Sequence, residues 1–303
     1  MDRDSVGWKG YWIAAPTPFS VTGVLDENAL RGVLRVYRDH GVHGVLVNGT
    51  TGEWFSQTDA ERRRVAEIAV EELAGKIPVV IGCTTFTPSQ TIVLGLHARD
   101  IGADGILSTP PPYAAPTPRE IVAFFTAISD GVDLPIMVYN WARGVAVEIT
   151  GQVAVELAKI RNVVALKDST TNRVQALTTL EKVGDRLRVF GGFIDRLGLS
   201  VLRGLGAKFA VAFYEAFWRG EFAAAEDAAD RYIALMTQLI RPDWSGAFGS
   251  PQAQIKACMN MLGQPGGYVR PPLLPIDDSR DLDALRRVLD EAGLLADAVR
   301  FAA

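Results

Sequence analysis

The sequence predicts a (β/α)8 (TIM) barrel that carries a C-terminal helical extension. Short runs of β-branched and apolar residues recur eight times before residue 213, and segments with apolar residues at helical spacing lie between them. The starts of successive runs lie 20 to 34 residues apart. A parallel strand-helix-strand unit needs roughly 30 residues, so this regular alternation closes naturally into a barrel.

The eight predicted strands share a short apolar run that follows a turn or a helix end. They are 11–15, 44–48, 78–83, 104–108, 135–140, 163–168, 188–191 and 208–212. Helix start signals punctuate the segments between them: Asp26, Thr58 and the Thr117-Pro118 pair each precede a run with helical periodicity. These signals support a helix after each of the strands concerned.

The chain is expected to divide into a barrel, residues 1–242, and an extension, residues 243–303. The extension contains an apolar helical stretch at 253–263 and a polar amphipathic helix at 279–295, joined by a Pro/Gly-rich linker. No long polar linker precedes it. We therefore expect the extension to pack on the barrel and not to form a separate domain.

Composition narrows the function classes. The 31 basic and 35 acidic side chains give a net charge of −4, which argues against a nucleic-acid surface. No stretch reaches the roughly 18 apolar residues of a membrane span, and the charged, Gly-broken amino terminus does not resemble an export signal. Two cysteines and three histidines offer neither a disulfide framework nor a metal site, so we expect a cytoplasmic protein without a metal.

Lys167 is the strongest candidate for catalytic chemistry. In such barrels the catalytic groups lie at the carboxyl ends of strands, and Lys167 ends the continuous apolar run 163–166. Burial disfavours the ammonium form, and a nucleophilic amine must be uncharged. The alternative is a structural ion pair with Asp168 or with a helix end. The other six lysines lie at helix ends, at strand entries or in the extension.

A second candidate site is the sequence GTTGE at 49–53, directly after the strand 44–48. Its glycines permit a tight turn, and the backbone N–H groups and hydroxyls of Thr50 and Thr51 can form a nest for a carboxylate. No Gly-Lys-Ser/Thr follows, so this is not a phosphate-binding P-loop. A plain tight turn is the alternative.

Two tyrosines are further candidates. Tyr139 ends the strand next to that of Lys167, so the two residues are expected at one rim about 5 Å apart, where a phenol can move protons to the amine. Tyr113 lies in the proline-rich loop 109–118, which is stiff enough to present its ring beyond the barrel mouth. For each tyrosine, ordinary packing is the alternative.

Taken together, these motifs resemble the dihydrodipicolinate synthase and N-acetylneuraminate lyase family over nearly the whole chain. The matching segments are GTTGE at 49–53, PPY at 111–113, VYN at 138–140, ALKDS at 165–169 and GQPGGYVRPPLLP at 263–275. A tyrosine 28 residues before the Schiff-base lysine is the spacing expected there. The resemblance implies a class I lyase, in which Lys167 forms an imine with a 2-oxo acid such as pyruvate, with no metal or organic cofactor.

The resemblance also implies roles for the other candidates. Tyr139 would be the general acid and base, and Thr50 would couple it to Tyr113 of the adjacent subunit, so a homotetramer or homodimer is expected. Gly49, Thr51 and the backbone N–H groups of the turn would hold the carboxylate of the keto acid. Gly192 would line the floor of the pocket.

Departures from the family concern the second substrate, which is often an aldehyde. The family's lysine-pathway enzyme has an Arg five residues after the tyrosine, whereas this chain has Gly144, with Arg143 one residue earlier. Trp141 suggests a more apolar distal pocket, and Phe193 replaces an acidic residue. The resemblance also implies that the segment 204–218 lacks about ten residues that usually separate the eighth strand from its helix.

Two alternative functions stay open. One is a dehydratase for a deoxy sugar acid, which uses the same lysine and tyrosine. The other is a regulatory barrel that captures a keto acid without turnover, which the shortened segment makes plausible. A metal-dependent aldolase is disfavoured because His40 and His43 precede the second strand, at the opposite rim.

Overall fold

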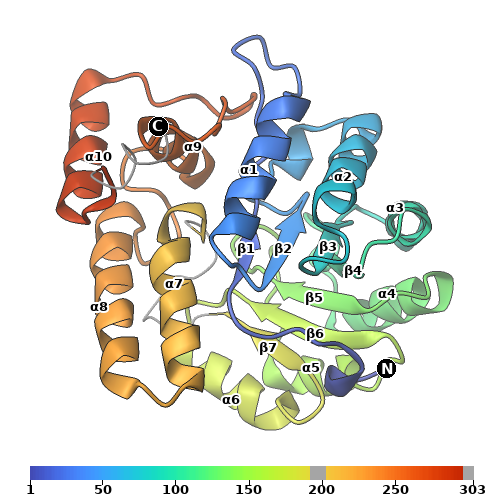
Figure 1. Ribbon diagram of the computed structural model, residues 1–303. Helices are drawn as coiled ribbons and strands as arrows, with labels where there is room; N and C mark the ends of the chain where they lie inside the picture. The colour runs from blue at the N-terminus through green and yellow to red at the C-terminus, as the bar shows by residue number, and fades with distance from the viewer. Residues whose placement is uncertain (192–202, 296–303) are drawn as a thin grey trace. The chain divides into compact units, whose positions relative to one another are not determined.

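The computed structural model describes residues 1–191 and 203–295 of the 303-residue chain (Figure 1). The described residues fall into two compact units. One unit consists of residues 1–9 and 78–191, and the other of residues 10–77 and 203–295. Gly192 and Phe193 lie outside the described residues. Of the helices that are described, none combines the length and the apolar character needed to cross a bilayer.

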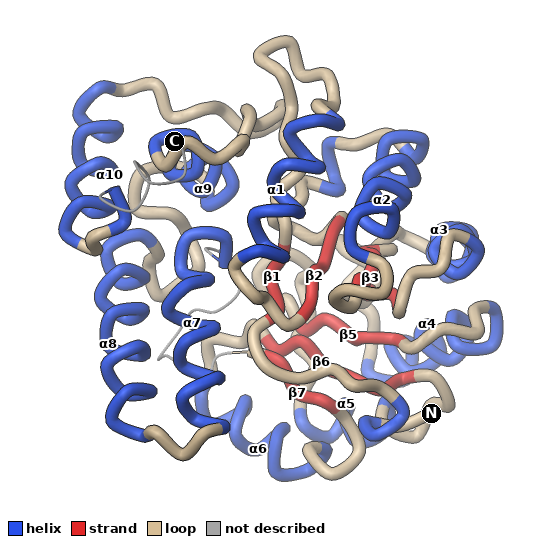
Figure 2. The backbone as a smooth tube through the Cα atoms, viewed as in Figure 1, coloured by secondary structure: helices blue, strands red, loops and turns tan. Residues whose placement is uncertain are grey.

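The unit that contains residues 78–191 is built on five parallel strands that pair in chain order (Figure 2). The strands are β3 (Val79–Gly82), β4 (Gly105–Ser108), β5 (Ile136–Asn140), β6 (Val163–Asp168) and β7 (Arg188–Phe190). Helices α3 (Pro88–Asp100), α4 (Pro118–Gly131), α5 (Gly151–Leu157) and α6 (Arg173–Val183) connect them, and a short 3-10 helix, η1 (Arg3–Ser5), precedes them. Parallel neighbours need such crossovers.

The strands β5 and β6 lie in the buried part of this sheet. Every residue of both strands is buried, and Ile136, Val138 and Val163 are fully inaccessible to solvent. A parallel sheet whose two faces are both covered requires such continuous apolar runs. The continuous apolar run at 163–166 therefore reflects a strand that is buried on both faces.

The second unit contains two parallel strands and most of the helices. Strand β1 (Trp12–Ala14) pairs with β2 (Gly44–Val47), and a side chain at Gly44 would collide with the Trp12 ring. The helices α1 (Glu27–Asp39) and α2 (Asp59–Leu73), with η2 (Trp54–Ser56) before α2, pack side by side, as do α7 (Arg203–Trp218) and α8 (Phe222–Leu239) (Figure 1). Helices α9 (Pro251–Met261) and α10 (Ser279–Glu291) complete it.

The three predicted helix starts are confirmed. The Asp26 carboxylate accepts a hydrogen bond from the Ala29 N–H at the start of α1. Thr58 and Thr117 each form a capping box with the glutamate three residues later, which satisfies two otherwise unpaired N–H groups at the starts of α2 and α4. Local signals therefore fixed these boundaries.

Seven of the eight predicted strands are found, and the eighth is wrong. Residues 208–212 lie inside the helix α7. The run is apolar without a turn residue, so its periodicity does not separate a strand from a buried helix. The helix is favoured because the aromatic residues recur every four positions and Phe213 stacks on Phe217, with ring centroids 6.2 Å apart.

The Pro/Gly-rich segment after α9 is fastened to the first helices of the same unit. The Arg270 guanidinium donates hydrogen bonds to both carboxylate oxygens of Glu61 on α2 and to the carbonyls of Ser56 and Gly23. It also lies 4.0 Å from the centroid of the Phe19 ring. The extension thus packs on residues 10–77, while the division at residue 242 stays a prediction.

Replacing Glu61 by Gln should remove a pH-dependent part of the stability. The bidentate bonds from Arg270 lower the pKa of Glu61 to about 2, below its ordinary value of 4.5. This stabilisation is therefore present above the ordinary pKa and is lost as the pH falls toward 2. Urea unfolding at pH 7 should show Glu61→Gln less stable by about 1 to 2 kcal/mol, a difference that shrinks below pH 4.5.

The matched control is Glu226→Gln, an exposed glutamate of α8 with no ion pair to any described residue. Its stability should follow that of the wild type at each pH. A constant difference between Glu61→Gln and wild type from pH 7 down to pH 3 would contradict the electrostatic origin.

Candidate active site

The structure places Lys167 directly beside Tyr139. The two residues are partners in the register of β6 against β5, and the Lys167 Nζ lies 4.1 Å from the centroid of the Tyr139 ring. Only 2% of Lys167 and 3% of Tyr139 is exposed. The predicted proximity at the carboxyl ends of neighbouring strands is confirmed, and the buried amine lies over the face of the tyrosine ring.

The next pair along the two strands is Asn140 and Asp168, which serves a structural purpose. The Asn140 Nδ2 donates to Asp168 Oδ1 at 2.9 Å, and the Thr170 N–H donates to the same oxygen at 3.0 Å. Burial raises the pKa of Asp168. Successive side chains of a strand point to opposite faces, and Asp168 makes no ion pair with Lys167. The alternative in which Asp168 neutralises the lysine is therefore not supported.

The GTTGE turn lies in the other unit and is tightly constrained. The Thr50 carbonyl accepts hydrogen bonds from the Glu53 N–H and from Gln252 Nε2, both at 3.1 Å. A Cβ at Gly52 would lie 3.1 Å from the backbone N of Asn48 and 3.2 Å from the Ala15 carbonyl, so the chain approaches itself closely there. Within this unit, no group accepts a hydrogen bond from the N–H or hydroxyl of Thr50 or Thr51.

Glu53, the last residue of the turn, belongs to a buried ion pair that the sequence analysis missed. Lys256 Nζ on α9 donates to Glu53 Oε1 at 2.5 Å and to the carbonyls of Thr17 and Tyr268, each at 2.7 Å. Glu53 is fully buried and Lys256 is 2% exposed. A lone lysine inside the apolar stretch 253–259 was the available signal, but its partner lies 203 residues away.

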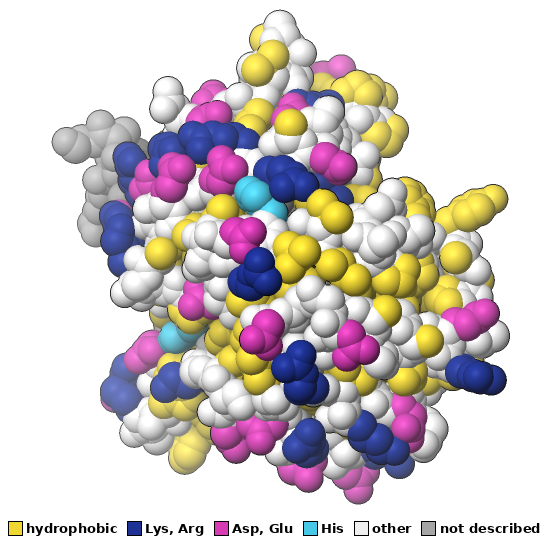
Figure 3. All heavy atoms as spheres, turned by 90° about the vertical axis from the view of Figure 1, so that its right-hand side faces the viewer, with side chains coloured by type: hydrophobic (Ala, Val, Ile, Leu, Met, Phe, Trp, Pro, Cys, Tyr) yellow, Lys and Arg dark blue, Asp and Glu magenta, His cyan; other side chains and the backbone are white. Residues whose placement is uncertain are grey.

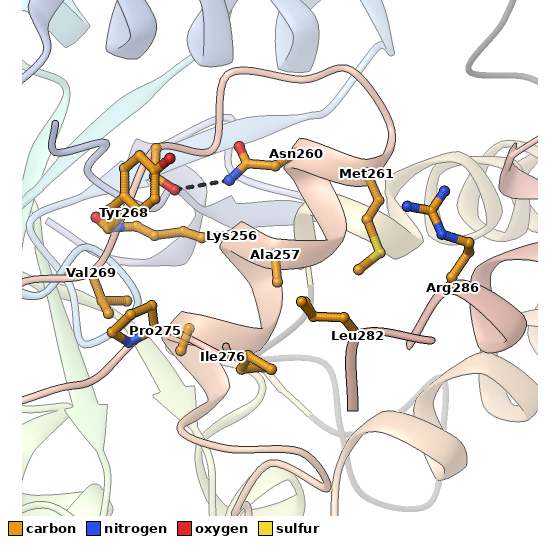
Figure 4. A pocket seen from close by; sticks show the side chains of 12 residues that line it. Lys256, Ala257, Asn260, Met261, Tyr268, Val269, Pro275, Ile276, Leu282 and Arg286 are labelled. Atoms are coloured by element: carbon orange, nitrogen blue, oxygen red, sulfur yellow. Dashed lines mark hydrogen bonds between the residues drawn. The ribbon is translucent and has the colours of Figure 1, made fainter. Parts of the chain in front are cut away.

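Burial lowers the pKa of Lys256 to about 8 and raises the pKa of Glu53, in each case against the opposing pull of its partner. The three hydrogen bonds use all three ammonium protons of Lys256. Its methylene stem extends away from α9 toward Tyr268, beside a cavity of about 320 Å³ (Figure 4). Lys256 therefore anchors the turn, with all of its ammonium protons engaged.

Comparison with known proteins identifies the family. Residues 8–292 match the model of the Dihydrodipicolinate synthetase family. This chain belongs to that family. It is 32% identical over 283 residues to a DapA-like lyase of unassigned function from Rhizobium meliloti, covering 90% of this chain and 92% of the relative. It is also 32% identical over 298 residues to 4-hydroxy-tetrahydrodipicolinate synthase of Phenylobacterium zucineum, covering 95% and 98%.

The fold is shared with a solved structure of the family. The chloride-inhibited dihydrodipicolinate synthase of Acinetobacter baumannii, complexed with pyruvate, superimposes with a TM-score of 0.85 at 23% identity, covering 94% of this chain and 99% of that one. The predicted fold class, a TIM barrel with C-terminal helices, is confirmed, with seven strands among the described residues. The chain is an enzyme of the class I lyase type that characterises the family.

Trp141 explains why this member of the family has a glycine at position 144. The Trp141 indole is 9% exposed and stacks on Tyr139, with ring centroids 6.0 Å apart. A side chain at Gly144 would collide with that indole, and the Gly144 N–H donates to the Trp141 carbonyl at 2.9 Å. Arg143, the neighbouring cation, is exposed. The indole therefore leaves no room for the arginine side chain that the family resemblance expects at position 144.

Within a single chain, the Tyr113 ring does not contact Tyr139 or Lys167. It is 94% exposed, and its backbone lies in the left-handed region, with φ of 73°. It makes no hydrogen bond or ring contact with any described residue. A second left-handed residue, Ala115, gives this loop a sharply turned course.

Other possible sites contribute little. No group of three or more His, Cys, Asp or Glu side chains in the described ranges could hold a metal ion. Both ring nitrogens of His43 have hydrogen-bond partners, since Nδ1 accepts from the Tyr11 N–H and Nε2 faces Glu215. On the face shown in Figure 3, basic and acidic side chains are interspersed and form no basic patch.

Proposed function

We propose that the enzyme forms an imine between Lys167 and a 2-oxo acid, with pyruvate as the simplest candidate. The observation that carries the proposal is the buried amine of Lys167, held 4.1 Å from the Tyr139 ring by the register of two parallel strands. The Acinetobacter baumannii synthase of the same fold is complexed with pyruvate, which supports a three-carbon keto acid as ligand.

The chemistry follows from the two side chains. The Lys167 nitrogen attacks the ketone carbon, the carbonyl oxygen leaves as water after two proton transfers, and a protonated imine remains. This imine accepts the electron pair released when a bond at the neighbouring carbon breaks. We assign the proton transfers to Tyr139, the residue that pairs with Lys167 in the register of β5 against β6.

The substrate's two ends require different surroundings. Gly49, Thr50 and Thr51 provide N–H groups and hydroxyls that have no acceptor within their unit, as a carboxylate site requires. At the distal end, the Trp141 indole favours an apolar second substrate or leaving group, with Arg143 as the nearest cation in sequence. Gly192, outside the described residues, is proposed to line the floor.

The choice between an aldolase and a dehydratase rests on the bond that the imine activates. Both use Lys167 and Tyr139, and an aldehyde or a sugar acid is the corresponding partner. We propose a cytoplasmic enzyme without a metal or organic cofactor, since the lysine itself supplies the electron sink. The exposed ring of Tyr113 supports a homodimer or homotetramer in which this residue enters a neighbouring site.

Borohydride reduction in the presence of pyruvate should attach the keto acid covalently to Lys167. Intact mass and peptide mapping would detect one adduct per chain, and Lys167→Met should give none. Lys159→Met, which removes an exposed lysine, should label as the wild type does. An unmodified wild-type mass would contradict the imine. An adduct without turnover of any aldehyde or sugar acid would favour the regulatory barrel.

Tyr139→Phe should slow imine formation by roughly 10²-fold, the usual contribution of one general acid-base group. The ring and its contact with Lys167 stay, while the proton carrier is lost. The measurement is the rate of trapping at saturating pyruvate. Tyr37→Phe, which removes a buried hydroxyl without a hydrogen-bond partner, should leave this rate unchanged. Equal rates in the two variants would remove Tyr139 from the mechanism.

Tyr113→Phe should lower turnover severalfold while leaving the melting temperature unchanged, because its ring is solvent-exposed in the single chain. The same rate in variant and wild type, with the oligomer intact by light scattering, would exclude Tyr113 from the proton relay.

A further inference from the structure

We infer that Gln252, in the first turn of α9, is a positioning residue that orients the peptide unit between Thr50 and Thr51 and thereby aims the Thr51 N–H at the keto-acid carboxylate. This inference rests on the proposed function and deepens it, because it assigns part of substrate binding to the C-terminal extension.

The geometry of one peptide unit carries the argument. In a trans peptide the C=O and N–H groups point in opposite directions, so fixing the Thr50 carbonyl also fixes the Thr51 N–H. The Glu53 N–H and the Gln252 Nε2 both hold that carbonyl at 3.1 Å. The opposite side of this peptide unit carries the Thr51 N–H, and Thr51 is only 7% exposed. No group in residues 10–77 or 203–295 accepts a hydrogen bond from this N–H. Buried N–H groups without acceptors are rare and point to a ligand.

The bond from Gln252 differs in kind from the bond inside the turn. The Glu53 N–H comes from the same five-residue turn and moves with it. Gln252 lies 202 residues away in the sequence, is 8% exposed and sits on a helix that is independently fixed. It therefore ties the peptide unit to a rigid element, which a local turn cannot do for itself.

Helix α9 holds the turn at two points on one face. Gln252 and Lys256 are four residues apart, so they lie one above the other on the helix. The first contacts the Thr50 carbonyl and the second the Glu53 carboxylate. The Ser250 hydroxyl caps the helix by accepting from the Ala253 N–H at 3.2 Å, which fixes the first turn that carries Gln252.

The same helix offers a matched control in Gln254. This residue is fully buried, donates from Nε2 to the Leu239 carbonyl at 2.8 Å and accepts from the Phe248 N–H at 3.1 Å. It is the same residue type on the same helix, and it also donates to a distant backbone carbonyl. Its contacts, however, are with the segment 239–248 and not with the GTTGE turn.

The experiment compares Gln252→Leu with Gln254→Leu in the full-length protein. Pyruvate is titrated and the fraction of Lys167 trapped by borohydride is measured by mass. Gln252→Leu should raise the pyruvate concentration for half-maximal trapping about fivefold to tenfold, as the loss of one oriented hydrogen bond predicts, without changing the extent at saturation. Gln254→Leu should keep the wild-type half-saturation even where its melting temperature falls.

A second ligand separates this inference from the proposed function. Lactate retains the carboxylate but has no ketone, so it can bind the turn without forming an imine, and its affinity is measured by calorimetry. Weaker lactate binding in Gln252→Leu than in Gln254→Leu supports the inference, whether or not pyruvate is trapped. Equal half-saturation and equal lactate affinity in the two variants would overturn it while leaving Lys167 trapping, and the proposed function, intact. Wild-type protein that neither binds lactate nor is trapped would overturn both.

Discussion

The parallel register of β5 and β6 is the constraint on which the proposed chemistry of this protein depends. It sets Tyr139 against Lys167 and, one residue later, Asn140 against Asp168. Because side chains alternate between faces, the first pair occupies the face that holds the amine and phenol, and the second forms a hydrogen bond on the opposite face. A slip by one residue would set Asn140 against Lys167 or Tyr139 against Asp168, so the Asn140–Asp168 bond stabilises the register that brings Tyr139 to Lys167.

Two buried lysines show how surroundings decide what one residue type does. Lys167 and Lys256 are each 2% exposed. Lys256 donates to one carboxylate and two carbonyls, so the ammonium is stabilised in place and serves as an anchor. Lys167 instead lies over an aromatic ring, with the neighbouring carboxylate turned away from it. The ion pair with Glu53 at 2.5 Å offsets the cost of burying the Lys256 charge.

The sequence predicted features that depend on local signals and failed where distant partners decide. The caps at Asp26, Thr58 and Thr117 and the proximity of Tyr139 to Lys167 follow from short patterns and strand geometry. The run at 208–212 was assigned to a strand because an apolar segment of five residues has no decisive period, whereas packing within α7 selects a helix. The buried pair of Lys256 and Glu53 was not predicted, because its two members lie 203 residues apart in the sequence.

The conformation of the GTTGE turn is therefore a property of the folded unit more than of its five residues. Glu53 adopts a left-handed backbone, φ 56°, which costs a non-glycine residue about 1 kcal/mol or more. Its two carboxylate oxygens are taken by Lys256 Nζ and by the Arg270 N–H, both from the C-terminal extension. An unpaired buried carboxylate would cost several kcal/mol, so the turn keeps this backbone only while the extension is in place. A helix some 200 residues later in the sequence thus holds both a carbonyl and the carboxylate of this short motif.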